Sequence, residues 1–373
     1  MESNKFLSFN SQGKLKIMHL TDTHIEDDNI DASLWLIEQA CKREKPDIVV
    51  VSGDNVHNYD DANKTKEYIR RFFSIFERLD IAVAVTFGNH DSERGPLSRK
   101  ELMEYYSTYP CHVADDKGNK PFTSGTYYVP VYSSDKSTLR FILWIFDSGD
   151  YDSEGHYGCM SAEDVQWYKG CSEEIKRNNG GKTVYSLAFQ HIIVPEVYDA
   201  LTRCTKRKLY SFSHMYNKED YYMFNPEVTN YGTLNETPCC GYENFGQFEA
   251  MVDCGDVLAV FSGHDHTNAF GVRHKGIDIV NSLSSRSQSD RFSSQYGYRI
   301  IEVSEKNTAE YTTRVGRWYN MFTVKDIKML KNEGDIKGSN IAAGVKYRGL
   351  IQRFMTKTGR VFCGLVTGRR NTY

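Results

Sequence analysis

The 373-residue chain has no stretch of about 18 consecutive apolar residues, the length that a membrane-spanning helix requires. The opening segment, Met1 to Asp22, also lacks an apolar run of the length found in secretion signals. Nine cysteines are present, but no two are spaced as a CxxC pair, which argues against a zinc ribbon and favours reduced thiols. Together these absences predict a cytoplasmic protein without a membrane span.

The chain also lacks a large net charge, because 46 Lys and Arg are balanced by 49 Asp and Glu. A formal charge of −3 gives no reason to expect nucleic-acid binding by the whole chain. Residues 321–373 differ, since 11 Lys and Arg against 3 Asp and Glu give them +8 and leave −11 for residues 1–320. We expect one domain over 1–320 and a basic extension over 321–373, either a small lobe or a tail docked on the acidic body. Nucleic-acid binding by this tail is a weaker alternative.

Strand-like and helix-like patterns alternate along the first part of the chain. Residues 48–51 are Ile-Val-Val-Val, as in a buried strand, and residues 63–79 repeat apolar side chains at helical spacing. This β-α-β-α-β order predicts a mostly parallel inner sheet with right-handed crossovers. The expected strands are 15–20, 48–51, 81–87, 126–132, 139–146, 183–190, 257–261, 277–280, 298–303 and 309–315, and the expected helices are 32–45, 63–79, 161–177 and 247–254.

The predicted fold class is α/β, a two-sheet β-sandwich flanked by helices in a four-layer αββα arrangement. Residues 126–132 and 139–146 are expected to form a hairpin, and Ser161 is expected to cap the helix that follows it. From about 194 to 244 the pattern gives way to Tyr, Asn, Pro and Cys, which predicts a long irregular insertion. Such a loop inside a compact domain usually has a function, so we expect it near the active site.

Short polar segments follow five of the predicted strands, and all are rich in Asp, Asn or His. They are Asp22-Thr23-His24, Gly53-Asp54, Gly88-Asn89-His90-Asp91, His191 and Gly263-His264-Asp265-His266. Side chains of these types, placed just beyond strand ends, can hold two divalent cations a few ångström apart. Each motif alone is weak evidence, but the four that contain more than one residue, in this order, point to hydrolysis of a phosphate ester by a metal-bound hydroxide.

With these motifs, residues 14–316 resemble the calcineurin-like metallophosphoesterase superfamily. The resemblance implies one metal site of Asp22, His24 and His266, and a second of Asn89, His191 and His264, with Asp54 bridging the two. It also implies that His90 faces the leaving-group oxygen. We interpret His90 as a general acid, with Asp91 fixing its orientation and raising its pKa. The alternative is that His90 and Asp91 only close a turn.

The segment GQFEAMVDCGDVLAVFSGHDHTNAF resembles the purple-acid-phosphatase-like branch of this superfamily. Purple enzymes have a Tyr three residues after the bridging Asp, where this chain has His57, so the metal pair is left open among Mn, Fe and Zn, divalent or of mixed valence. His57 is either a residue that orients Asp54 or an ordinary surface histidine.

Substrate selectivity must come from other residues. Arg286 and Arg291, in a Ser-rich loop, are candidate phosphate clamps through bidentate hydrogen bonds. Arg203, in the insertion, is a candidate contact to the leaving group. For each arginine a solvent-exposed charge is the competing interpretation. The aromatic side chains of the insertion could stack on a substrate ring, but packing of the loop against the sheet is the preferred interpretation.

The leading functional hypothesis is a dinuclear metal-dependent phosphomonoesterase that uses a metal-bridging hydroxide on a phosphorylated small molecule or phosphoprotein. A phosphodiesterase or nuclease on the same metals is the second hypothesis. A non-catalytic scaffold of the same fold is the third. The presence of all seven expected ligands and of His90 argues against the scaffold.

Overall fold

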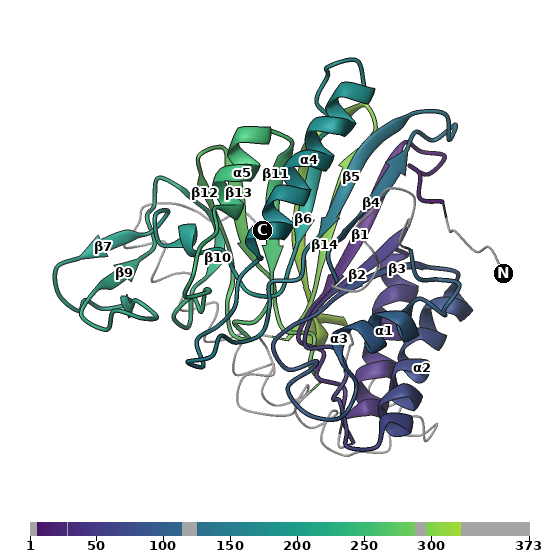
Figure 1. Ribbon diagram of the computed structural model, residues 1–373, viewed down its shortest axis with the longest axis horizontal. Helices are drawn as coiled ribbons and strands as arrows, with labels where there is room; N and C mark the ends of the chain where they lie inside the picture. Colours follow the sequence, from purple (N-terminus) through teal and green to yellow (C-terminus); the bar gives the residue numbers. More distant parts are fainter. Residues whose placement is uncertain (1–5, 28, 114–124, 288–295, 322–373) are drawn as a thin grey trace.

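The computed structural model describes residues 6–27, 29–113, 125–287 and 296–321. Two β-sheets pack against each other with helices on both outer sides, which confirms the predicted α/β sandwich (Figure 1). The five-stranded sheet has the order β15 (Asn307–Arg317), β14 (Gly297–Ser304), β1 (Lys14–Leu20), β2 (Ile48–Ser52) and β3 (Ala82–Thr86). The seven-stranded sheet has the order β10 (Thr229–Thr233), β12 (Ala269–His274), β13 (Ile277–Asn281), β11 (Val257–Ser262), β6 (Ser186–Phe189), β5 (Leu139–Ile145) and β4 (Tyr127–Tyr132).

The first sheet is built by the predicted β-α-β-α-β unit. Strands β1, β2 and β3 are parallel neighbours, connected through α1 (Ile30–Glu44) and α2 (Ala62–Leu79). Helix α2 begins where the Asp61 side chain accepts a hydrogen bond from the Asn63 backbone N–H. Its apolar face is buried, including Phe72 and Phe76, as the spacing predicted. Strands β14 and β15 add antiparallel to β1.

The alternation of side chains along β5 shows how the two layers of apolar core arise. Leu143 and Ile145 belong to the core shared with the first sheet, whereas Ile142 and Trp144 pack under α4 (Ala162–Asn178) and α5 (Gln247–Cys254). Both sets are buried, so β5 has two apolar faces. The predicted hairpin is confirmed by the antiparallel pairing of β4 with β5, and Ser161 caps α4 as predicted.

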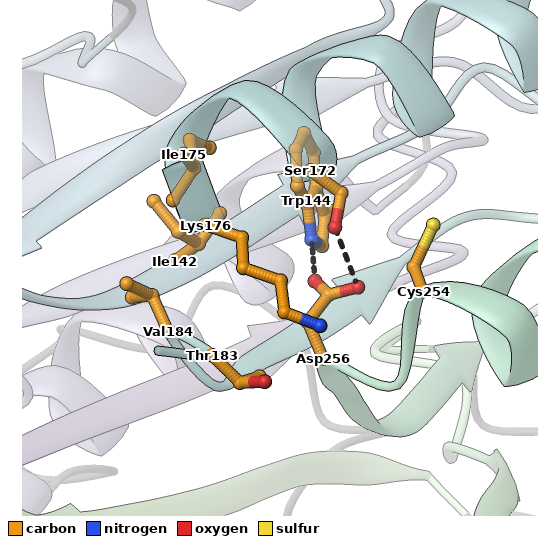
Figure 2. Close-up of a pocket in the computed structure, with 9 residues that line it drawn as sticks. All are labelled: Ile142, Trp144, Ser172, Ile175, Lys176, Thr183, Val184, Cys254 and Asp256. Carbon is orange, nitrogen blue, oxygen red and sulfur yellow. Dashed lines mark hydrogen bonds between the residues drawn. The ribbon is translucent and has the colours of Figure 1, made fainter. Parts of the chain in front are cut away.

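A buried carboxylate connects α4 to the seven-stranded sheet. Asp256, at the start of β11, accepts hydrogen bonds from Trp144 Nε1 (2.9 Å), Tyr168 OH (2.6 Å), Ser172 Oγ (3.1 Å) and Ser186 Oγ (2.7 Å). Asp256 and Lys176 both line a small pocket at this position (Figure 2). These contacts join α4, β5, β6 and β11, so the Gly255-Asp256-Val257 segment has a structural role.

The insertion is more regular than predicted. It contains the 3₁₀ turn η1 (Pro195–Val197), a three-stranded sheet of β7 (Thr202–Cys204), β9 (Tyr221–Met223) and β8 (Phe212–Ser213), and β10, which joins the edge of the larger sheet. Strands β7 and β9 lie at the left edge of the molecule in Figure 1. Tyr216, Tyr222 and Phe224 pack against the core under the larger sheet, which agrees with the preferred packing interpretation of these aromatics.

The remaining differences from the sequence predictions are local. Helix α3 (Arg99–Tyr106) and strand β12 were not predicted, and β6 is shorter than the expected 183–190. The short α6 (Trp318–Met321) ends the described part of the chain. Within that part, no helix is both long enough and apolar enough to cross a bilayer. Arg291 and residues 322–373, with the predicted basic extension, lie outside the described residues.

Candidate metal centre

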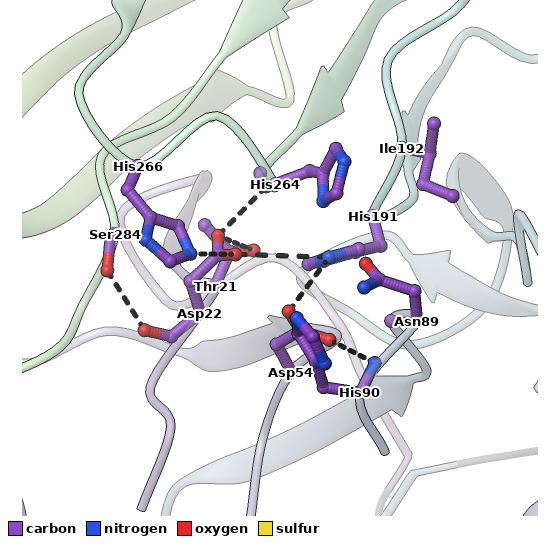
Figure 3. Close-up of polar contacts among 12 residues, drawn as sticks. Thr21, Asp22, Asp54, Asn89, His90, His191, Ile192, His264, His266 and Ser284 are labelled. Carbon is purple, nitrogen blue, oxygen red and sulfur yellow. Dashed lines mark hydrogen bonds and ion pairs between the residues drawn. The ribbon is translucent and has the colours of Figure 1, made fainter. Parts of the chain in front are cut away.

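The candidate ligands lie together because both sheets present the carboxyl ends of parallel strands at the same end of the sandwich. β1 leads to Asp22 and His24, β2 to Asp54, and β3 to Asn89. From the other sheet, β6 leads to His191 and β11 to His264 and His266. Figure 3 shows Asp22, Asp54, Asn89, His191, His264 and His266 pointing toward a common region. Residues far apart in the sequence therefore form one cluster.

Two groups of side chains within this cluster have the geometry to hold a cation. Potential ligand atoms of Asp22, His24, Asp54 and His266 lie within 4.8 Å of one another, and so do those of Asp54, His191 and His264. Asp54 belongs to both groups. Its Oδ2 lies 3.6 Å from His24 Nε2 and 3.3 Å from His191 Nε2. A carboxylate shared in this way can bridge two metal ions.

In Asp22, Asp54 and Asn89, one polar side-chain atom faces the cluster and the other forms hydrogen bonds within the protein. Asp22 Oδ2 accepts hydrogen bonds from the Thr21 hydroxyl (2.8 Å) and the His264 N–H (3.0 Å). Asp54 Oδ1 accepts one from the His90 N–H (2.9 Å). Asn89 Nδ2 donates to the hydroxyl of Tyr151 (2.7 Å). These bonds orient Asp22 Oδ1, Asp54 Oδ2 and Asn89 Oδ1 toward the same region.

Several of these atoms are buried without a hydrogen-bond partner among the described residues. They are Asp22 Oδ1, Asn89 Oδ1, His191 Nε2 and His264 Nε2. Burying a polar atom without a partner is costly, so such atoms in one cluster need a common explanation. His191 Nδ1 contacts the carbonyl of Ser52 at 3.0 Å, which leaves the lone pair of the neutral ring on Nε2. The donor set therefore fits two cations.

The backbone around the cluster is strained. Asp22, His24, Asp54 and His264 all have positive φ angles, of 51°, 40°, 51° and 69°. Side chains other than glycine rarely adopt this conformation, and such strain concentrates at functional sites. The cluster is also crowded, since a Cβ at Gly88 would lie 2.3 Å from Asp54 Oδ1. Glycine at this position lets the backbone after β3 approach Asp54.

Burial and neighbouring charges set the protonation of the cluster. Burial opposes ionisation of Asp54, but His191 and His24 hold its pKa well below the usual value. Burial would also lower the pKa of His191, but the charges of Asp54 and Asp22 raise it to about 9. At His264, burial and the charge of His191 act together and lower the pKa to about 3. The ionised carboxylates and the neutral His264 imidazole are suitable metal ligands, and a cation bound at His191 would take the place of its Nε2 proton.

The predicted role of Asp91 is wrong. Its carboxylate does not orient His90 but accepts hydrogen bonds from the backbone N–H groups of Asp54 (2.8 Å), Asn55 (3.0 Å) and Gly88 (2.7 Å). Asp91 therefore links the loops that follow β2 and β3. Consecutive side chains point in different directions, so adjacency to His90 in the sequence did not place the two side chains together.

The partner of His90 is Glu93, which the sequence reasoning missed. Glu93 Oε2 lies 2.5 Å from His90 Nδ1, so Nε2 of His90 is the ring nitrogen left for a ligand. The His90 side chain is 46% exposed, and its ring centroid lies 5.7 Å from that of His24. His90 thus lies at the mouth of the cluster. A carboxylate three residues after a histidine was the available signal.

A cavity adjoins the first group of ligands on the side of His57. It is lined by His24, Glu26, Asp54, Val56, His57, His90 and Asp91. The His57 ring packs edge-on against Tyr59, with centroids 4.4 Å apart. His57 therefore forms part of the wall of this cavity beside the candidate metal centre. His156, in a separate loop, contacts Asp152 and stacks on Tyr242.

The candidate substrate arginines occupy different places. Arg286 forms an ion pair with Glu26 (2.6 Å). The pKa of His24 is lowered to about 4, mainly by burial, and the charge of Arg286 contributes to this lowering. Arg286 is therefore a neighbour of the cluster. Arg203 is different, because its exposed guanidinium is paired with Asp220 in the three-stranded sheet. That pairing occupies the group predicted to contact a leaving group.

Comparison with known proteins agrees with this geometry. The model of the calcineurin-like phosphoesterase family matches residues 15–268, so the chain belongs to that family, as the motifs predicted. Two curated relatives come from Arabidopsis thaliana. "Probable inactive purple acid phosphatase 14" is 25% identical over 88% of this chain and 83% of its own length. "Probable inactive purple acid phosphatase 29" is 24% identical over 73% and 72%.

Two solved structures were also found to be similar. A dimetal phosphatase from Danio rerio has a TM-score of 0.46 and 12% identity, covering 81% of this chain and 98% of its own. GAP50, described as the anchor in the inner membrane complex of Plasmodium, has a TM-score of 0.45 and 13% identity, covering 82% and 85%.

Proposed function

We propose that the protein is a dinuclear metal-dependent phosphomonoesterase that acts on a phosphorylated small molecule or phosphoprotein. The observation that supports this most directly is the position of Asp54, which belongs to both groups of candidate ligands. Asp22, His24 and His266 would complete one metal site, and Asn89, His191 and His264 the other. Two bound cations, whether Mn, Fe or Zn, would supply a hydroxide nucleophile at neutral pH and neutralise the phosphate oxygens.

The residues around the ligands would complete the catalytic machinery. His90, exposed at the mouth and held at Nδ1 by Glu93, is placed to donate a proton from Nε2 to the leaving-group oxygen. Arg286, beside His24 and anchored by Glu26, is a candidate to bind a phosphate oxygen. We do not extend this proposal to Arg203, whose charge is engaged by Asp220.

The names of the curated relatives favour one alternative, a non-catalytic scaffold, because those proteins are described as inactive. In this chain the carboxylate, amide and imidazole donors gather at one point, where they are buried or half-buried. Several of their atoms have no hydrogen-bond partner among the described residues. Retention of that costly arrangement supports metal binding.

A direct test combines metal analysis with turnover. The purified protein should bind two equivalents of metal and hydrolyse p-nitrophenyl phosphate with added Mn, Fe or Zn. Asp54→Asn and His264→Ala should abolish turnover and reduce the metal content. Glu67→Gln, which removes an exposed charge on α2, is the matched control and should change neither. Folded protein that binds two metals without turnover across these metals would favour the scaffold.

Monoester and diester hydrolysis can be separated with paired substrates. If the function is phosphomonoesterase, kcat/KM for p-nitrophenyl phosphate should exceed that for bis-p-nitrophenyl phosphate, with equal dependence on Asp54. A reversed preference would support the phosphodiesterase or nuclease hypothesis.

We also propose a reducing, cytoplasmic location. Eight cysteines in the described ranges are free, and Cys41, Cys111, Cys204 and Cys240 among them are buried. Reduced thiols of this kind are typical of cytosolic proteins. Localisation of a tagged full-length protein, with thiol labelling in cell extracts, would test this.

A further inference from the structure

An aromatic surface adjoins the second group of candidate ligands. Tyr151 accepts a hydrogen bond from Asn89 through its hydroxyl (2.7 Å), and Tyr151 remains 36% exposed. Behind it lies Tyr157, with ring centroids 5.6 Å apart. Tyr157 in turn packs edge-on against the His264 ring at 4.3 Å. Both tyrosines thus contact residues that would bind the same metal ion.

The loop that carries these rings is held in place by its own backbone. Tyr151 and Tyr157 pair as an isolated antiparallel bridge, and the Gly158 N–H donates to the Asp150 carbonyl at 2.9 Å. The Tyr242 N–H donates to the Tyr157 carbonyl at 3.0 Å, which ties the loop to the end of the insertion. A ring fixed in this way can receive a ligand at little cost in conformational entropy.

Tyr151 adjoins the segment that carries the proposed acid. Its hydroxyl is held by Asn89 (2.7 Å), and His90 directly follows Asn89 in the chain. A substituent on an oxygen that receives a proton from His90 could therefore reach the exposed Tyr151 ring.

The cavity beside His57 has a different character. It is lined by Glu26, His57, His90, Asp91 and the metal-ligand candidates His24 and Asp54, with Val56 as the apolar member of its lining. This mostly polar lining suits phosphate and water. A neutral ring is better accommodated by an exposed aromatic ring, because offset or edge-to-face aromatic contacts are favourable beyond the area they bury.

We propose that Tyr151, backed by Tyr157, is the leaving-group contact of this site and selects phosphomonoesters of phenols over those of aliphatic alcohols. This inference rests on the proposed function, because it assigns the substrate class of the same site. The phenol ring of the substrate lies against the exposed Tyr151 ring while its ester oxygen meets His90.

Binding of two non-hydrolysable ligands tests the inference without turnover. Phenylphosphonate and cyclohexylphosphonate carry the same charged group and differ in the aromaticity of the ring. Calorimetric titration of the metal-loaded protein should show phenylphosphonate binding about three- to tenfold more tightly, the selectivity expected of one aromatic contact. Titrations are made at saturating metal, with the metal content and Tm of every variant measured.

Two substitutions of Tyr151 separate the ring from the hydroxyl. Tyr151→Phe and Tyr151→Leu both lose the contact to Asn89, but only Tyr151→Phe retains an aromatic ring. The phenyl preference should persist in Tyr151→Phe and fall to about onefold in Tyr151→Leu, since the aromatic contact is then lost. His57→Leu, in the wall of the cavity that does not include Tyr151, is the control and should retain the preference.

The outcomes distinguish this inference from the function on which it rests. Equal binding of the two phosphonates by the wild type, or loss of the preference in His57→Leu but not in Tyr151→Leu, overturns the assignment of Tyr151 alone. Failure of the metal-loaded protein to bind either phosphonate overturns the assignment and also counts against the proposed phosphomonoesterase.

Discussion

Glu93 Oε2 and His90 Nδ1 lie 2.5 Å apart at the mouth of the candidate metal centre. A carboxylate in this position fixes the orientation of the imidazole and leaves Nε2 toward an incoming substrate. The relationship replaces the predicted pairing of His90 with Asp91, whose carboxylate is used by backbone N–H groups. If His90 is the general acid, Glu93 is its positioning residue.

The first prediction concerns this pair. Glu93→Ala should lower kcat by about tenfold, less than the roughly 10²- to 10⁴-fold that a positioned acid supplies. KM and metal content should change little, because Glu93 is not a candidate ligand. Glu93→Gln, which can still accept from Nδ1, should recover part of the rate. If Glu93→Ala lowers kcat by the same factor in the His90→Gln variant as in the wild type, the assigned role of Glu93 is contradicted.

The second prediction concerns the hydrogen bond between Asn89 and Tyr151. Tyr151→Phe should weaken one of the two metal sites by about 10- to 100-fold, because the amide loses the partner that directs its oxygen inward. Competition with a chelator would measure this change site by site. Tyr242→Phe, a substitution on a ring that is 56% exposed, is the matched control. Identical metal affinity in Tyr151→Phe and wild type would refute the prediction.

Removal of metal is the basis of the third prediction. The candidate ligands follow strands of both sheets, so bound cations would join the two halves of the sandwich. Metal at 100 times its Kd should stabilise the fold by about 2.7 kcal/mol and raise the Tm of a domain of this size by about 4 °C. Thermal unfolding with chelator and after metal is restored measures the shift. Asp54→Asn should abolish most of it.

The fourth prediction concerns stability away from the metal centre. Asp256→Ala should lower the free energy of unfolding by about 3–5 kcal/mol, because four buried donors lose a charged acceptor. Urea denaturation with an unchanged slope would give the value. Asp253→Ala, at a side chain that is 67% exposed on α5, should change stability by no more than about 0.5 kcal/mol. Comparable losses in the two variants would rule out the structural role of Asp256.

Much of the fold was predictable because its signals are local. The continuous Ile-Val-Val-Val of β2, the apolar face of α2 and the Ser161 cap of α4 depend on residues within a turn or two of one another. The insertion was harder, since β10 exists only through its pairing with β12 about 40 residues later in the chain. The local Tyr- and Asn-rich sequence of the insertion does not indicate which strand β10 will pair with.

The composition and order of the motifs determined, from the sequence alone, the family and the residues that gather at one end of the sandwich, because parallel strands end at a common edge. Which way each side chain points was decided by the tertiary structure. Asp91 turns to the backbone beneath Asp54, Glu93 reaches His90, and Tyr151 holds Asn89 from a separate loop. The directions of Asp91 and Tyr151 depend on hydrogen bonds to residues 37 and 62 positions away, which neighbouring residues in the sequence do not specify.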